Sequence, residues 1–227
     1  MEHTMFNGFS EQTIDFLWGI RLNNEKSWFE SHKEEYKRVL EQPMKALASE
    51  VYKAFNEKYP ELGLFCYLSR IYRDARRLFG RGPYKDCLWF TLARGEDRLE
   101  KPSFWFEIMP ATWTYGLGYY SAKPITMLKH RRRIDNNPKP MEKLARALNH
   151  QTEFVLEGED YKRPKGDPGE LLYDWYNKKT FSLIHEEKVG SAIYSPDLVQ
   201  RLLDGFSFLV PYYEYFSSLD SDPDPDM

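Results

Sequence analysis

The segment TWTYGLGYYS, residues 112–121, alternates bulky and small side chains along the chain. Trp113, Tyr115 and Leu117 occupy one set of alternate positions, and threonine and glycine occupy the other set. Side chains of a β-strand alternate between the two faces of its sheet. This pattern therefore predicts a strand with one face of bulky side chains and one face of small residues, here called the stripped face. Glycines on the stripped face allow another backbone, a helix or a ligand to approach closely.

Three neighbouring segments are rich in aromatic and β-branched residues, a composition that favours strands. They are LFCYLSRIYR (64–73), DCLWFTLAR (86–94) and SFWFEIMPA (103–111). Short connections between consecutive strands favour antiparallel pairing. The sequence therefore predicts a mostly antiparallel sheet within about residues 64–121.

The residues before and after this region have helical spacing. Ser10 is placed to cap a first helix, and Pro43 fits the first turn of a later one. The last apolar helical segment contains Pro211, which we expect to bend or interrupt it. These features predict a single α+β domain over residues 1–219, with N- and C-terminal helices packed on the sheet. The acidic end, residues 220–227, is predicted to be a disordered tail.

The composition restricts the class of protein. The chain has 227 residues, of which 16% are aromatic, too many for a disordered protein. A formal net charge of −3 argues against a whole surface that coats nucleic acid. Cys66 and Cys87 are interpreted as free thiols of a reducing compartment. No signal peptide or apolar run of ~20 residues is evident, so we expect a soluble cytoplasmic protein without a membrane partner. The oligomeric state is not predicted.

Positive charge is concentrated in RIYRDARRLFGRGPYKD, residues 70–86. Its cations are Arg70, Arg73, Arg76, Arg77, Arg81 and Lys85. Its glycines and proline predict a loop between two strands that could present backbone N–H groups. Arginine side chains and free amides together suit phosphate or carboxylate, so we predict an arginine-lined pocket for a small anionic ligand. The segment lacks the spacing of a P-loop.

Several short motifs, in order along the chain, resemble one family. They are FNGF (6–9), LNNEKSWF (22–29), RIYRDARRLFGRGPYK (70–85), RRRI (131–134), YKRPKG (161–166) and KTF (179–181). Together they resemble the bacterial and fungal conserved-hypothetical family known as domain of unknown function 2461. The resemblance spans nearly the whole chain and implies a soluble single domain, but the family has no established activity. Arg77 and Arg81 depart from its usual phenylalanine and lysine.

The candidate ligand-binding residues come from three of these motifs. They are Arg70, Arg73, Asp74, Tyr84, Lys85, Arg131 and Asn24. The cations would neutralise the ligand, the aspartate would orient a guanidinium, and the tyrosine would stack on the ligand or hydrogen-bond to it. The asparagine would line the same pocket or, alternatively, end a helix. Whether the basic segments 70–85, 130–133 and 161–166 converge on one cleft is left open.

Two other interpretations remain open for these residues. A nucleic-acid or protein interaction module could use the basic loops with exposed aromatic residues such as Tyr72 and Phe79, although nucleic acid is not favoured. Alternatively, the arginines could be purely structural. Glu107, alone among aromatic residues, either faces solvent or is buried beside an arginine, and in the second case it would be a site candidate.

Motifs of metal binding and of catalysis are missing from the sequence. The five histidines are scattered, and neither CxxC, HExxH nor GxSxG spacing occurs. We therefore expect no metal and no cofactor. The catalytic residues are unknown, and whether a reaction follows binding is left open.

Overall fold

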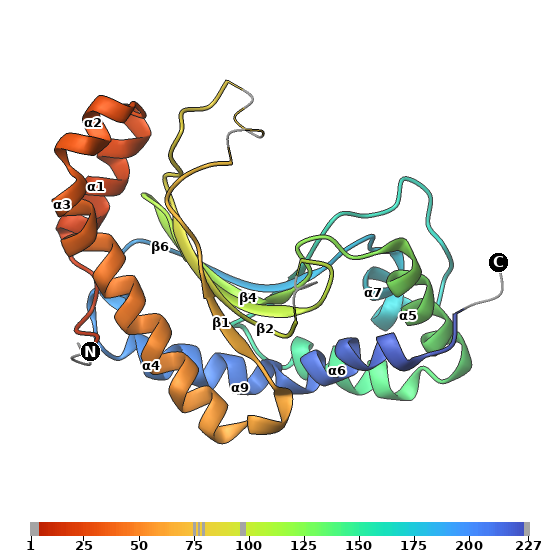
Figure 1. Ribbon diagram of the computed structural model, residues 1–227. Helices are drawn as coiled ribbons and strands as arrows, with labels where there is room; N and C mark the ends of the chain where they lie inside the picture. The colour runs from red at the N-terminus through yellow and green to blue at the C-terminus, as the bar shows by residue number, and fades with distance from the viewer. Residues whose placement is uncertain (1–4, 75, 77, 79, 96–98, 225–227) are drawn as a thin grey trace. The chain divides into compact units, whose positions relative to one another are not determined.

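The protein has an α+β fold, as the sequence predicted (Figure 1). The computed structural model describes residues 5–74, 76, 78, 80–95 and 99–224. Its antiparallel sheet has six strands in the order β1-β2-β3-β4-β6-β5. The strands are β1 (Phe65–Leu68), β2 (Leu88–Ala93), β3 (Ser103–Ile108), β4 (Thr112–Gly118), β5 (Val155–Glu157) and β6 (Ser182–Lys188). Strands β1 to β4 lie within the predicted region, whereas β5 and β6 were not anticipated.

The described residues form two compact units, and the sheet supplies strands to both. Unit 1 comprises the residues up to Leu92, together with Trp105–Tyr115 and Glu186–Asp204. Unit 2 comprises Ala93–Phe104, Gly116–His185 and the residues from Gly205 onward. The domain boundary that we drew at residue 219 stays a prediction.

The helices of unit 1 come mainly from the N-terminal quarter of the chain. They are α1 (Glu11–Leu22), α2 (Lys26–Ser31), α3 (Lys33–Tyr36), a π-helical turn η1 (Lys37–Glu41), α4 (Gln42–Lys58), the 3-10 turn η2 (Pro60–Leu62) and α8 (Ser191–Tyr194). The hydroxyl of buried Thr13 donates a hydrogen bond of 2.6 Å to the carbonyl of Val39 within the π-helical turn. A side chain bonded to a helical carbonyl perturbs the regular ladder, which accounts for the irregular turn before α4. Helix α4 contacts β1 (Figure 1).

The bulky face of β4 is buried, as its alternation predicted. Trp113 and Leu117 are fully buried and Tyr115 nearly so. In unit 1, Phe106 of β3 packs between Phe90 and Trp113, with ring centroids 5.8 and 6.1 Å away. Such aromatic contacts supply much of the apolar area that stabilises the fold.

At Gly118, the last residue of β4, the backbone of the neighbouring strand in the sheet approaches closely. A Cβ atom at Gly118 would lie 2.5 Å from the carbonyl oxygen of Phe181 and 2.8 Å from the Cα atom of Ser182. Among the three possibilities that the sequence left open, the neighbour at this glycine is therefore strand β6, to which Ser182 belongs.

Unit 2 is built around the C-terminal helix. Its elements are α5 (Pro124–Asn136), α6 (Lys139–Asn149), the 3-10 turn η4 (Glu170–Leu172), α7 (Tyr173–Asn177), the part of α9 (Leu198–Ser217) from Gly205 onward, and the 3-10 turn η5 (Ser218–Ser221). The Phe181 and Phe216 rings are 4.0 Å apart at its core. Of the bend or interruption that we predicted at Pro211, an interruption does not occur, because helix α9 continues through this residue. Among the described residues, none of the helices combines the length and apolar character needed to cross a membrane.

The acidic segment after α9 makes specific contacts within unit 2. Asp222 accepts hydrogen bonds from Nε and Nη2 of Arg133 at 2.8 and 2.6 Å, and Asp220 pairs with Lys101 at 2.7 Å. The described part of the predicted tail thus makes ion pairs, while disorder over residues 220–227 stays a prediction and residues 225–227 lie outside the described residues.

Replacing Asp222 with alanine is expected to lower the free energy of unfolding by about 1 kcal/mol, because a two-pronged arginine–carboxylate pair is stronger than an ordinary surface pair. Urea unfolding measures the change. Asp224→Ala is the matched control, since Asp224 is 79% exposed in its pair with Lys129 and should have little effect. Equal effects of the two substitutions would contradict the expectation.

Candidate functional site

The basic stretch of residues 70–86 forms a hairpin that extends the β1–β2 pair. Tyr72 and Tyr84 form an antiparallel bridge. On either side of it, the Arg73 N–H donates to the Pro83 carbonyl at 2.8 Å and the Lys85 N–H donates to the Ile71 carbonyl at 2.7 Å. The predicted strand–loop–strand arrangement is thus present. Arg77 and Phe79, which we considered at the tip, lie outside the described residues.

Asn24, after the end of α1, fastens this hairpin to the helices. Its side-chain amide donates to the Tyr84 carbonyl at 2.9 Å and accepts from the Tyr84 N–H at 2.9 Å. A Cβ atom at Gly82 would lie 2.2 Å from Oδ1 of Asn24 and 2.5 Å from its carbonyl oxygen, so this approach requires glycine. The Tyr84 ring is buried and stacks on Phe29 at 4.2 Å. Asn24 and Tyr84 therefore position the hairpin.

Asp86 joins two arginines at the base of the hairpin. It accepts from Nε of Arg21 at 2.5 Å and from Nη2 of Arg73 at 3.4 Å. Arg73 also donates through Nε to the Tyr84 carbonyl at 2.7 Å. Part of the hydrogen-bonding capacity of Arg73 is therefore used within the protein.

Asp74 orients a guanidinium, and the partner is Arg76. Nε and Nη2 of Arg76 donate to the two carboxylate oxygens at 3.0 and 2.8 Å, and its backbone N–H also donates to Asp74 at 3.0 Å. The Arg76 side chain is 88% exposed, so this pair lies in solvent.

Arg70, Arg73 and Lys85 form a basic cluster in unit 1. Burial of Lys85 is the main cause that lowers its pKa, and the charges of Arg73 and Arg70 lower that pKa further. Two acidic groups, Cys87 and Glu107, oppose the shift. The Lys85 ammonium also lies 5.4 Å from the centre of the Trp89 ring. The charges of two predicted site residues, Arg70 and Arg73, therefore act on a third, Lys85.

Cys87 and Glu107 border the basic cluster. Burial raises the pKa of the Glu107 carboxyl, whereas a hydrogen bond with Cys87 and the charge of Lys85 lower it. Burial also raises the pKa of the Cys87 thiol above its ordinary range. Glu107 is thus partly buried, with a thiol and an ammonium as neighbours rather than the arginine that we considered. The alternation of Lys85, Cys87 and Trp89 could have placed this cysteine on the same strand face.

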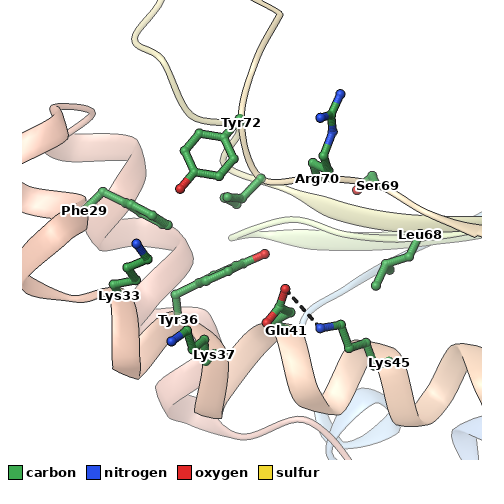
Figure 2. Close-up of a pocket in the computed structure, with 11 residues that line it drawn as sticks. Phe29, Lys33, Tyr36, Lys37, Glu41, Lys45, Leu68, Ser69, Arg70 and Tyr72 are labelled. Atoms are coloured by element: carbon green, nitrogen blue, oxygen red, sulfur yellow. Dashed lines mark ion pairs between the residues drawn. The ribbon is translucent and has the colours of Figure 1, made fainter.

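A cleft lies beside the hairpin, between the N-terminal helices and the end of β1 (Figure 2). Its volume is about 400 Å³. It is lined by Phe29, Lys33, Tyr36, Lys37, Glu41, Lys45, Leu68, Ser69, Arg70, Ile71 and Tyr72. Glu41 and Lys45 form an ion pair of 3.2 Å across one turn of helix. The guanidinium of Arg70 points away from the helical lysines in Figure 2, so its charge lies outside the helical side of the cleft.

The other two basic segments meet in unit 2. Arg131 is only 8% exposed, and its guanidinium lies 5.3 Å from the centre of the Tyr161 ring. Lys165 lies 4.6 Å from the centre of the same ring. In the run HRRR, Arg132 is exposed and Arg133 pairs with Asp222, so these side chains do not share one ligand.

The fold and the hairpin define an α+β protein in which a half-buried asparagine, Asn24, anchors a basic β-hairpin. The chain belongs to the family described as "Conserved hypothetical protein (DUF2461)", which matches residues 12–215. This match confirms the resemblance that the motifs indicated. A comparison with curated proteins found no match.

Proposed function

We propose that unit 1 binds a small anionic ligand, bearing phosphate or carboxylate, at the basic cluster of Arg70, Arg73 and Lys85. The observation that carries the proposal is the meeting of these three cations on the two strands of one hairpin. Among the described residues Arg70 has no ion pair, and the nearby Asp86 is already shared by Arg73 and Arg21. An anion would relieve the repulsion between the three cations and accept charge-assisted hydrogen bonds from them.

The other predicted residues of the hairpin have positioning roles in this proposal. Asn24 and Tyr84 hold the strand that carries Lys85, and Asp86 holds the guanidinium of Arg73. Asp74 keeps Arg76 in a solvent-exposed pair. A site whose cations are held before the ligand arrives loses less entropy on binding. A cytoplasmic location, where Cys66 and Cys87 would stay reduced, remains a prediction.

A nucleic-acid or protein interaction module is the second candidate. Tyr72 supports it, because this aromatic side chain is 49% exposed next to the basic cluster. Exposed aromatic rings beside cations are typical of proteins that bind single strands. Such binding would weaken steeply with salt, whereas binding of a small anion would depend on salt less strongly.

Replacing Arg70 with alanine is expected to remove ligand-dependent stabilisation while leaving the fold intact, because Arg70 is exposed and makes no ion pair with a described residue. Thermal unfolding would be followed with malonate, adenosine monophosphate and a short oligothymidylate at two salt concentrations. A probe at about 100 times its Kd should stabilise the wild type by about 2.7 kcal/mol.

Arg76→Ala is the matched control for this experiment, because Arg76 lies on the same hairpin but is 88% exposed and paired with Asp74. It should retain the stabilisation. A wild type that no probe stabilises, or an equal loss in both variants, would contradict the proposed site. Stabilisation by the oligothymidylate alone, with steep salt dependence, would favour the interaction module.

A further inference from the structure

A buried cation in unit 2 has no hydrogen-bonding partner among the described residues. Arg131, on α5, is 8% exposed, and its Nη1 atom is buried without a partner within the described part of the chain. Its described contact is with the face of the Tyr161 ring, 5.3 Å away. Burying a charged donor without an acceptor costs several kcal/mol, so this guanidinium is suited to an anion from outside the chain.

The nearest acidic side chain on α5 is already engaged. Asp135, one helical turn after Arg131, accepts a hydrogen bond from the Tyr176 hydroxyl at 3.0 Å to one oxygen and 3.1 Å to the other. Burial is the main cause that raises the pKa of Tyr176, the hydrogen bond to Asp135 and its charge raise it further, and the charge of Arg131 opposes this rise. Arg131 is thus close to this pair, but the carboxylate accepts from the tyrosine instead.

The loop YKRPKG brings a second cation to the same ring. The ammonium of Lys165 lies 4.6 Å from the centre of the Tyr161 ring, and Lys165 itself is exposed. Lys162 and Arg163, in the same loop, are exposed as well. Arg131 is therefore the buried cation, and Lys165 the exposed cation, of a basic site beside the Tyr161 ring.

Asn177 fixes this loop in place. Its Oδ1 atom accepts from the Lys165 N–H at 2.6 Å, and its Nδ2 atom donates to the Gly166 carbonyl at 3.1 Å. Its backbone carbonyl accepts from the Tyr161 N–H at 3.1 Å. Asn177 is only 5% exposed, so both loop residues of the site are anchored on a buried side chain and its backbone.

We propose that Arg131, Tyr161 and Lys165 form a binding site for a phosphate group, separate in its residues from the basic cluster of unit 1. A phosphate has three oxygens to share, so it can accept two hydrogen bonds from an arginine fork and still pair with a lysine. A carboxylate has one negative charge and two oxygens, whereas a phosphate group carries up to two negative charges. The presence of two cations therefore favours phosphate. This inference does not depend on the proposed function.

The test uses pyrophosphate as the probe, at constant ionic strength, with Kd measured by calorimetry. Arg131→Met and Lys165→Met are each expected to weaken binding about tenfold or more, the loss of one charge-assisted contact. Arg132→Met is the control on the same helix, because Arg132 is exposed, and it should keep the wild-type Kd.

Stability without the probe gives a second readout. Arg131→Met should melt at or above the wild-type temperature, because the substitution removes an unpaired buried charge. A purely structural Arg131 would instead give a lower melting temperature and leave pyrophosphate affinity in Lys165→Met unchanged. If Arg131→Met does not fold, Lys165→Met decides alone, since its exposed side chain can be removed without harm to the core.

Three results would overturn the phosphate site. The first is that pyrophosphate does not bind the wild type. The second is that Arg132→Met weakens binding as much as Lys165→Met, which would indicate diffuse attraction. The third is that malonate binds as tightly as pyrophosphate, which would exclude selectivity for phosphate.

Discussion

Lowering the pH from 7 to 5 is expected to remove about 2 kcal/mol from the free energy of unfolding through His130 alone. This side chain is fully buried in unit 2, and burial lowers its pKa to about 3, helped by the charges of Arg131 and Arg133. In the unfolded chain a histidine has a pKa of about 6.5, so below that pH the unfolded state binds a proton that the folded state does not. The contribution of His130 is therefore present above pH 6.5 and is lost as the pH falls towards 3.

The contacts of His130 fit a neutral imidazole. Its Nε2 atom lies 3.2 Å from the carbonyl oxygen of Trp175, which can only accept, so Nε2 carries the hydrogen. Its Nδ1 atom lies 3.4 Å from the Tyr215 hydroxyl, which is then the donor. Buried polar groups keep such partners because an unpaired one is costly.

The measurement is urea unfolding at pH 7, 6 and 5 for the wild type and His130→Gln. As the pH falls, the free energy of unfolding should decrease faster in the wild type than in His130→Gln. Below pH 6 the difference between the two slopes should approach about 1.4 kcal/mol per pH unit. His32→Gln is the control, because that imidazole lies half-buried on the surface of α2 and α3. Identical pH dependence in wild type and His130→Gln would contradict the prediction, whatever the stability of the variant at pH 7.

The fold could be predicted where the pattern of side chains is local. The alternation around Trp113 and Tyr115 identified β4 and its buried face, because each strand residue must choose one of two faces. Strand β6 was not predicted, because its sequence SLIHEEK has few apolar residues and its partner β4 is distant along the chain. Helix α9 runs through Pro211 against the local rule, since packing of its apolar residues outweighs the loss of one backbone hydrogen bond.

The basic hairpin could be located from the sequence, but the structural roles of its residues could not be assigned. The density of cations indicated the hairpin, and the charges of Arg70 and Arg73 act on Lys85 there. The sequence could not show that Asn24 would bond the backbone of Tyr84, sixty residues away, because such contacts depend on tertiary structure. The sequence indicated a free thiol at Cys87 but not its hydrogen bond with Glu107, because Glu107 is on another strand.

The geometry of the basic cluster therefore depends on a residue that carries no charge. Lys85 follows Tyr84 directly, and Asn24 holds both backbone groups of that tyrosine. Like-charged side chains repel, so a hairpin that carries three cations needs attachments that do not depend on those cations. Asn24 and the stacking of Tyr84 on Phe29 provide such attachments, and Asp86 pairs with one of the cations, Arg73.

Replacing Asn24 with alanine is accordingly expected to lower the free energy of unfolding by about 3 kcal/mol. The substitution removes two hydrogen bonds and leaves the buried Tyr84 N–H without an acceptor, and each unpaired buried group costs about 1–3 kcal/mol. Amide hydrogen exchange should also become faster at Arg73 and Lys85, whose N–H groups close the hairpin. Urea unfolding and exchange measure the two effects.

Asn23→Ala provides the matched control, since Asn23 is exposed and its side chain donates only to the Gly19 carbonyl at the end of α1. Its cost should stay below about 1 kcal/mol, the usual scale of a helix-end contact, with unchanged exchange in the hairpin. Asn24→Asp tests the two hydrogen bonds separately. The aspartate can still accept from the Tyr84 N–H, but it has no amide to donate to the Tyr84 carbonyl, which would face a carboxylate oxygen instead. If Asn24→Ala were no more costly than Asn23→Ala, the hairpin would be held by Arg73 and Asp86 instead.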